Sequence, residues 1–203
     1  MRFSLRLRSE SRFMATLVIP EHHRLRAKAE RFICEVYEAE YGARIGSLPR
    51  NLFVAIDPQG AILCAAGFRT CVDGFFSERY LDAPIEAALT RVSGQSVMRD
   101  RVFEISTFAS RSPHSIQPFV NDAINYADSV GFEWGFFTLT RRLRLLLDRF
   151  GLELSLLGAA DASRIEEAAA WGSYYEKGPK VYAGNRDSLT PQLATRRRQA
   201  ANA

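Results

Sequence analysis

The stretch RVFEISTF, residues 101–108, decides the fold that we expect. Its apolar and polar side chains alternate, and a period of two is typical of a β-strand with one buried face. Ser112 and Pro113 follow this strand, and Pro is favoured in the first turn of a helix. The apolar residues of 116–127 then recur at helical spacing, so we expect a helix that ends near Gly131.

Strands and helices alternate after this helix. Residues 134–138 are apolar enough for a buried strand, and a helix over 141–150 is stopped by Gly151. A strand over 152–157 and a helix near 161–169 follow. This order of elements is typical of strand–helix–strand units.

The residues before the central strand contain a hairpin. Its two strands are joined by the turn DPQG at 57–60, in which Pro and Gly supply the backbone angles that a turn requires. The expected elements are a first strand somewhere in 2–19, a helix over 21–41 stopped by Gly42, strands over 51–56 and 61–69, and a helix over 78–92. The whole order predicts a mixed α/β (α+β) fold.

The composition indicates one folded domain over 1–187 and a tail over 188–203. The chain has 203 residues, of which 47% are hydrophobic and 11% aromatic, so intrinsic disorder of the whole is excluded. The tail contains three consecutive arginines at 196–198, and we expect it to be basic and disordered.

The net charge of +4 comes from the two ends of the chain. Residues 1–26 hold six Arg against two Glu, and the tail adds three Arg, whereas residues 27–195 have a small acidic excess. Binding of nucleic acid phosphates needs basic groups gathered on one surface. We therefore expect no nucleic-acid partner.

Cysteine and histidine positions argue against a metal centre. Cys34, Cys64 and Cys71 lack CxxC spacing, and we expect them to be inert buried thiols. His22 and His23 are adjacent and lack a third ligand nearby. The apolar runs are short and interrupted by charges, so we expect no transmembrane segment, no standard secretion signal and a cytoplasmic location.

The order of elements resembles the GNAT acyltransferase fold, and the sequence is similar to the thermostable hemolysin family over about residues 20–186. The motifs that carry this similarity are RFI (31–33), YGA (41–43), AGFR (66–69), YLDAPIE (80–86), FEI (103–105), FAS (108–110), FTLT (137–140), WGSYY (171–175) and PKVYAG (179–184). The resemblance implies a GNAT-like mixed central β-sheet flanked by helices on both faces. The family name records a lytic phenotype and states no mechanism.

A second resemblance is to acyl-homoserine-lactone synthases, which share the GNAT-like core and take acyl chains from acyl carrier protein. The segment Gly67–Arg69 is similar to the end of one of their central strands, and Glu104, Ser106 and Phe108 match another. Thr107 stands where the synthases have Arg, and their acidic Asp-x-Tyr-Asp segment has no counterpart here. The resemblance implies acyl transfer, with acyl carrier protein as a partner.

Glu104 is the candidate catalytic residue. Acyl transfer to an amine needs an acceptor for the proton that the amine loses. A carboxylate on a strand built from Val102, Phe103 and Ile105 would be desolvated, and its raised pKa would suit this task. The alternative interpretation is a structural Glu that forms an ion pair with Arg69 on a neighbouring strand.

Further residues are predicted to hold the substrates. The planar fork of Arg69 can bind a carboxylate or a carbonyl group. The aromatic run at 132–137 would line an acyl tunnel or belong to the plain core. The other predicted substrate-binding residues are Arg31, Phe32, Tyr37, Ser106, Trp134 and Phe136, and the predicted donor-binding residues are Thr107, Phe108, Ala109, Arg111, Ser112 and His114.

The donor is predicted to be an acyl-phosphopantetheine thioester. Residues 110–115 contain no glycine, which hinders close approach of the backbone to the pyrophosphate of coenzyme A. We therefore favour acyl carrier protein over coenzyme A. Carrier proteins are strongly acidic, and the basic arm with Arg2, Arg6 and Arg8 would help one to dock.

The leading hypothesis is a cytoplasmic N-acyltransferase that moves a fatty acyl group to an amine or amino-acid-like acceptor. The competing hypothesis is a non-catalytic lytic or membrane-surface protein, as the family name implies. Its physical support is the basic, amphipathic segment 1–26, which would lie on anionic lipid.

Overall fold

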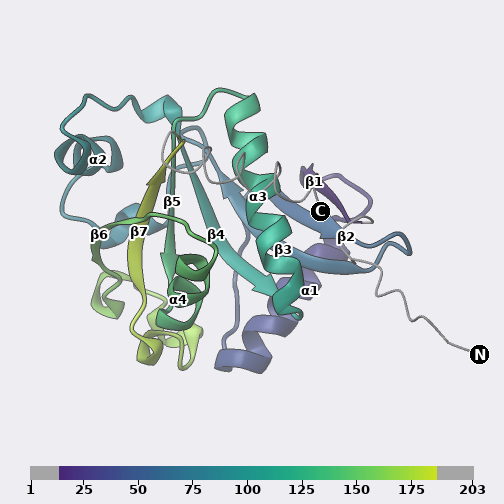
Figure 1. The fold of residues 1–203 in the computed structure, drawn as a ribbon. Coiled ribbons are helices and arrows are strands. Elements are labelled where there is room, and N and C mark those ends of the chain that lie inside the picture. The colour runs from purple at the N-terminus through teal and green to yellow at the C-terminus, as the bar shows by residue number, and fades with distance from the viewer. Residues whose placement is uncertain (1–13, 187–203) are drawn as a thin grey trace, which may run out of the picture.

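The computed structural model describes residues 14–186, which form one seven-stranded sheet with helices on both faces (Figure 1). The strands are β1 (Ala15–Ile19), β2 (Asn51–Ile56), β3 (Ile62–Arg69), β4 (Val102–Ser110), β5 (Trp134–Leu139), β6 (Ser155–Ala159) and β7 (Lys180–Asn185). Their order across the sheet is β1–β2–β3–β4–β5–β7–β6. β4 and β5 are parallel, and the other neighbouring pairs are antiparallel.

Four α-helices in the described residues cover the two faces of the sheet. They are α1 (Arg26–Tyr41), α2 (Ile85–Ser93), α3 (Pro113–Ser129) and α4 (Arg141–Arg149). Ile33 of α1 shares a buried cluster with Val54 of β2, whereas Phe119 of α3 packs on the adjacent Phe53, with ring centroids 5.2 Å apart. Because successive strand residues point to opposite faces, α1 and α3 cover opposite sides.

The central strand β4 follows the alternation that its sequence predicts. Val102 and Glu104 point toward the face that α2 covers, and Phe103 and Ile105 point toward α3. Glu104 is fully buried, with 0% of its surface exposed. A fully buried carboxylate therefore lies at the centre of the sheet.

Most predicted elements are confirmed, with shifted bounds. The first strand occupies the second half of the 2–19 range, and the hairpin strands match β2 and β3. The first long helix begins at Arg26 and ends at Tyr41, and the following Gly42 adopts the left-handed conformation. Pro84 divides the helix expected over 78–92, because a short 3-10 helix precedes it and α2 begins only at Ile85.

The prediction of a helix near 161–169 is wrong. The chain forms short 3-10 helices at Ala162–Arg164 and Ala168–Trp171 instead. The Asp161 side chain accepts a hydrogen bond from the Ser163 backbone N–H, which competes with helical pairing. Ile165 is extended and buried in the core, so the alanine-rich sequence cannot continue as a regular helix.

The strand β7 was not expected. Its sequence, KVYAGN, is short and contains a glycine, yet it pairs with β5 on one side and with β6 on the other. Val181 and Ala183 are fully buried. The tertiary neighbours, rather than local propensity, make this segment a strand.

Residues 1–13 and 187–203 lie outside the described residues, and the predictions of a basic docking arm and a basic tail fall mainly on them. Within 14–186, no helix has the length and apolar character needed to cross a membrane.

Candidate active site

β4 and β5 pair only at their first residues. Their ladder joins Val102–Glu104 to Trp134–Phe136, although β4 continues to Ser110 and β5 to Leu139. Beyond the ladder the two strands diverge toward their carboxyl ends (Figure 1). The β5-facing edge of β4 beyond Glu104 thus has no ladder partner within 14–186, so its peptide groups are available to a ligand.

A bulge interrupts β4 at Thr107, inside the diverging part. Ser106 pairs with Gly67 and Ala109 pairs with Ala65, so β4 has one residue more than β3 between these pairs. Thr107 has a φ of 45° and is the one non-glycine residue of 14–186 with a positive φ. Strain of this kind in a β-branched residue concentrates at functional sites.

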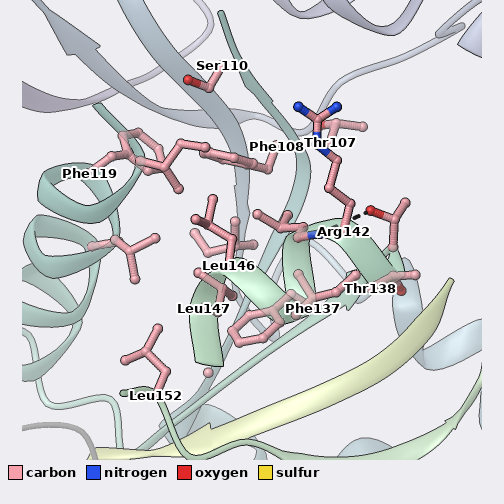
Figure 2. A pocket seen from close by; sticks show the side chains of 18 of the residues that line it. Thr107, Phe108, Ser110, Phe119, Phe137, Thr138, Arg142, Leu146, Leu147 and Leu152 are labelled. Carbon is pink, nitrogen blue, oxygen red and sulfur yellow. Dashed lines mark hydrogen bonds between the residues drawn. The ribbon is translucent and has the colours of Figure 1, made fainter. Parts of the chain in front are cut away.

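A cavity of about 1180 Å³ occupies the space where the strands diverge (Figure 2). It lies between α3, α4 and the sheet, and apolar side chains form most of its wall. They come from β4 (Phe103, Ile105, Phe108), from α3 (Ile116, Phe119, Val120, Ala123, Ile124, Ala127), from β5 (Phe137, Leu139), and from α4 and the segment after it (Leu143, Leu145, Leu146, Leu147, Leu152, Leu154). Such a lining suits an extended apolar ligand.

The cavity also reaches the α1 side of the sheet. Tyr37, Tyr41 and Tyr174 line it there, and the rings of Tyr41 and Tyr174 meet edge to face at 5.2 Å. Burial raises the pKa of Tyr37 and Tyr174 far above the ordinary value of 10. These phenols therefore stay protonated and cannot accept a proton from a substrate.

The β5 residues that line the cavity are the neighbours of the two β5 residues that were predicted to bind substrate. Trp134 and Phe136 are buried in the core under α2 and do not line the cavity. Gly135 and Phe137, one residue along in each case, do line it. A Cβ at Gly135 would lie 2.6 Å from the Phe103 ring, so this close packing requires glycine.

Three hydrogen bonds hold the Glu104 carboxylate. The backbone N–H of Phe76 donates to Oε2 at 2.7 Å, and the backbone N–H and Oγ of Ser77 donate to Oε1 at 2.9 and 2.7 Å. Burial raises the pKa of the Glu104 carboxyl, while the hydrogen bonds and the charge of Arg69 oppose this shift. Glu104 does not itself line the cavity.

A second hydroxyl connects Glu104 to the cavity. Thr138 Oγ1 lies 2.8 Å from Ser77 Oγ and donates to it, and Thr138 lines the cavity (Figure 2). The Thr138, Ser77 and Glu104 side chains thus form a continuous hydrogen-bonded chain from the cavity wall into the core.

Arg69 and Ser106 lie on the same face of the sheet as Glu104. Arg69 is the cross-strand partner of Glu104, and Ser106 packs over Gly67. Arg69 Nε and Ser106 Oγ are buried without a hydrogen-bond partner in the described residues. Neither residue lines the cavity, so they adjoin the carboxylate and not the apolar wall.

Only some of the predicted donor-binding residues line the cavity. Thr107, Phe108 and Arg111 line the cavity, whereas Ala109, Ser112 and His114 do not. Arg111 is already engaged, because its guanidinium forms an ion pair with Glu35 at 2.5 Å and lies over the Phe32 ring at 5.1 Å.

The residues predicted on α1 differ in their environment. Tyr37 lines the cavity, and Phe32 belongs to the buried core beside it. Arg31 is exposed and away from the cavity, because it lies one position before the core-facing pair Phe32 and Ile33 on the helix. The structure thus brings Tyr37 to the site and leaves Arg31 outside it.

The sequence profile of the family described as thermostable hemolysin matches residues 19–189. The chain belongs to this family. No curated protein matches it at a significant level.

Solved structures share the fold of this thermostable hemolysin family member. The acyl-homoserine-lactone synthase LasI has a TM-score of 0.58 at 10% identity, over 85% of this chain and 90% of LasI. FeeM, an N-acyl amino acid synthase from uncultured soil microbes, has a TM-score of 0.58 at 16% identity, over 88% of this chain and 94% of FeeM. A protein described as an N-acetyltransferase from Lactobacillus plantarum has a TM-score of 0.52 at 11% identity, over 85% of this chain and 98% of that protein. The predicted GNAT-like fold is confirmed.

Sequence reasoning missed two polar residues of the site in this thermostable hemolysin family member. Ser77 is the first residue of a short 3-10 helix, and only the tertiary fold brings it to Glu104, 27 positions away. Thr138 ends the strand that the sequence predicts over 134–138, but the sequence prediction gives its hydroxyl no role. The signal that could have indicated it is a polar residue at the end of an otherwise apolar strand.

Proposed function

We propose that this protein is an N-acyltransferase that moves a fatty acyl group from a phosphopantetheine thioester to an amine. The observation that carries the proposal is the apolar cavity of about 1180 Å³ at the point where β4 and β5 diverge. The fold shared with acyl-homoserine-lactone synthases, an N-acyl amino acid synthase and an N-acetyltransferase supports an enzyme of the acyltransferase class.

The acyl chain would occupy the space between α3 and α4. Its wall is formed by the methyl groups of Val120, Ile124, Leu146, Leu147 and Leu152. Burial of an alkyl chain is worth about 0.8 kcal/mol for each methylene group. A wall of this kind rewards each added methylene, which favours a fatty acyl group over an acetyl group.

The thioester carbonyl would lie against the diverging part of β4. The peptide groups around the Thr107 bulge have no partner from β5, and backbone N–H groups in such a position stabilise developing negative charge on a carbonyl oxygen. The strained φ of Thr107 fixes the direction of these groups.

Glu104 would accept the proton that the amine loses. Burial raises the pKa of its carboxyl, which makes the carboxylate a better base near neutral pH than an exposed glutamate. Two carboxylates that line the cavity, Glu35 and Glu40, are less suited, because they form ion pairs with Arg111 and Arg142.

Arg69 would contribute to acceptor recognition. It adjoins Glu104 and carries a buried Nε without a hydrogen-bond partner in the described residues. A partly buried guanidinium group favours an acceptor with a carboxylate, which is why an amino-acid-like amine is proposed.

The donor would be an acyl carrier protein in preference to coenzyme A. The loop at 110–115 has no glycine, and its Arg111 is held by Glu35 and Phe32. This leaves one exposed helix start for a single phosphate and no glycine-rich cradle for a pyrophosphate. A cytoplasmic location would bring the enzyme to such donors.

The proposal is tested with the purified chain and long-chain acyl thioesters of acyl carrier protein and of coenzyme A. Each donor is mixed with a panel of amino acids and simple amines, and N-acyl products are detected by mass spectrometry. Glu104→Gln is expected to lower the rate about 10²- to 10⁴-fold. The exposed carboxylate Glu153 supplies the matched control, and Glu153→Gln is expected to keep the full rate.

Two results would overturn the proposal. One is the absence of N-acyl product with every donor and acceptor, and the other is a Glu104→Gln variant as fast as the natural protein. Leakage of anionic vesicles without any acyl donor would favour direct lysis, the alternative that the family name implies.

A further inference from the structure

The buried position of Glu104 poses a problem for its role as the proton acceptor. Its carboxylate is covered by the backbone of Phe76 and Ser77, and it does not line the cavity where an amine would react. Direct contact between the amine and Glu104 would require the Phe76–Ser77 segment to move. The structure offers a route that needs no such movement.

Two hydroxyl groups lie between the carboxylate and the cavity. Ser77 Oγ is 2.7 Å from Glu104 Oε1, and Thr138 Oγ1 is 2.8 Å from Ser77 Oγ. Both distances are typical of strong O–H···O hydrogen bonds. Thr138 lies on β5 just past the point where β4 and β5 part, and its side chain is at the cavity wall (Figure 2).

We propose that Thr138 and Ser77 relay the proton of the attacking amine to Glu104. This inference rests on the acyltransferase function proposed above and assigns Thr138 as the residue that meets the amine. Ser77 acts through Thr138 and Glu104, so it is a positioning residue. Glu104 is the terminal acceptor.

The direction of the hydrogen bonds fits this role. Thr138 donates to Ser77, and Ser77 donates to Glu104, so the lone pairs of Thr138 Oγ1 remain open to accept a proton from the amine. A hydroxyl can donate one hydrogen bond while it accepts others. Transfer of one proton along the chain reverses both hydrogen bonds and leaves Glu104 neutral, which is the form that burial favours.

The atoms and charges of the step balance. The amine nitrogen forms a bond to the thioester carbon, and the C–S bond breaks with its electron pair on the leaving thiolate. The nitrogen gives one proton to Thr138, whose own proton passes to Ser77, and the Ser77 proton passes to Glu104. The proton then returns along the chain to the thiolate, so the net products are an amide and a free thiol.

Within residues 14–186, the charged and phenolic groups packed on this face do not compete for the proton. Arg69 on β3 is the charged neighbour of Glu104, and its charge favours the carboxylate form of Glu104. The phenols of Tyr80 and Tyr175 belong to the core cluster on this face and are hydrogen-bonded to each other at 2.8 Å. Burial raises the pKa of both phenols, so they remain protonated.

The test compares variants at the cavity end of the chain. Thr138→Val keeps the shape of the side chain and removes the hydroxyl, whereas Thr138→Ser keeps the hydroxyl. We expect Thr138→Val to lower kcat about 10²-fold with little change in the KM of the acyl donor, and Thr138→Ser to recover most of kcat. Ser77→Ala is expected to lower kcat to a similar degree.

A matched control separates this role from stability. Thr16 on β1 also donates a side-chain hydrogen bond, to Asp122 at 2.6 Å, and it lies away from the cavity. Thr16→Val removes an equivalent bond and is expected to keep the natural kcat. Thermal unfolding of each variant is measured in parallel, so that a loss of folded protein is corrected for.

The outcomes distinguish the relay from the function on which it rests. An inactive natural protein overturns the acyltransferase and the relay together. An active protein whose Thr138→Val variant keeps its kcat overturns the relay alone, and so does a Thr138→Ser variant no better than Thr138→Val. Loss of kcat in Thr138→Val with recovery in Thr138→Ser supports the relay.

Discussion

Arg69 and Glu104 are cross-strand partners on β3 and β4, yet the Glu104 carboxylate takes its three hydrogen bonds from Phe76 and Ser77. Arg69 Nε has no hydrogen-bond partner in the described residues. The guanidinium therefore acts on Glu104 through its charge, which lowers the pKa of the carboxyl against the larger effect of burial. The same guanidinium keeps donor capacity for a ligand.

Replacing Arg69 is expected to shift the pH dependence of acyl transfer upward. In Arg69→Met, the positive charge beside Glu104 is lost, so the pKa of the carboxyl rises further. The base form then appears only at a higher pH, and the acidic limb of the kcat–pH profile moves to higher pH. Arg91 is exposed on α2 and serves as the control, because Arg91→Met should leave the limb in place. An unmoved limb in Arg69→Met would show that the two side chains are not coupled.

Glu104 is expected to make the protein less stable as the pH rises. Its pKa in the folded state lies above the ordinary value of 4.5, so the folded protein keeps a proton that the unfolded chain has lost. The free energy of unfolding therefore falls as pH rises from about 4.5 through the folded pKa. Glu104→Gln lacks this titration, so the stability of the natural protein relative to the variant should decline over that window. Urea unfolding at a series of pH values measures the difference, and parallel curves would contradict the prediction.

Alternation and turn chemistry predicted much of the fold, and tertiary context decided the rest. The β4 sequence and the turn at 57–60 indicated their elements because local residues dictate them. β7 could not be predicted, since its strand character comes from β5 and β6 on either side. The same holds for the site. Glu104 stands out in the sequence as a carboxylate in an apolar strand, whereas Ser77 reaches Glu104 only through the tertiary fold.

The side of the sheet that each β5 side chain faces could not be predicted from the sequence. A run in which residues 132, 134, 136 and 137 are all aromatic has no alternation, so nothing local tells which of them face the cavity. The register with β4 settles this question, because it places Phe136 beside Glu104 and leaves Phe137 for the cavity side. Local patterns therefore located the segment, and strand pairing selected its residues.

Thr107→Gly is expected to stabilise the protein and slow acyl transfer. A β-branched residue with φ of 45° carries about 1–3 kcal/mol of strain, and Thr107 Oγ1 is buried without a partner in 14–186. Glycine removes both the backbone strain and the buried hydroxyl, so the free energy of unfolding should rise by about 1 kcal/mol. It also makes the bulge more flexible, so kcat should fall. Urea unfolding and steady-state kinetics measure the two effects. Thr107→Ser keeps the hydroxyl as the control, and a less stable glycine variant would disprove stored strain.

Arg99 is expected to stabilise the segment that carries Ser77. Its guanidinium binds both oxygens of Glu78 at 2.6 Å and Glu86 at 2.8 Å, and Glu78 also accepts the Ile85 N–H at the start of α2. Arg99→Ala should lower the free energy of unfolding by about 1 kcal/mol, because the pairs are partly solvated. The Arg99 hydrogen bond lowers the pKa of Glu78, so this contribution is present above pH 4.5 and is lost as the pH falls. A variant whose deficit is the same at low and neutral pH would contradict the ion pair as its cause.

The cavity wall is expected to set the length of the acyl chain. Ala123 of α3 lines the cavity, and Ala123→Leu adds three carbon atoms to the space between α3 and α4. With about 0.8 kcal/mol for each methylene group displaced, kcat/KM for a palmitoyl donor should fall by about tenfold to fiftyfold. An octanoyl donor, which does not reach as far, should keep its kcat/KM. Ala27 is an exposed residue of α1, and Ala27→Leu is the control for a general effect of leucine on a helix. If Ala123→Leu lowers both donors equally, the acyl chain does not occupy this cavity, because a blocked binding site must discriminate by length.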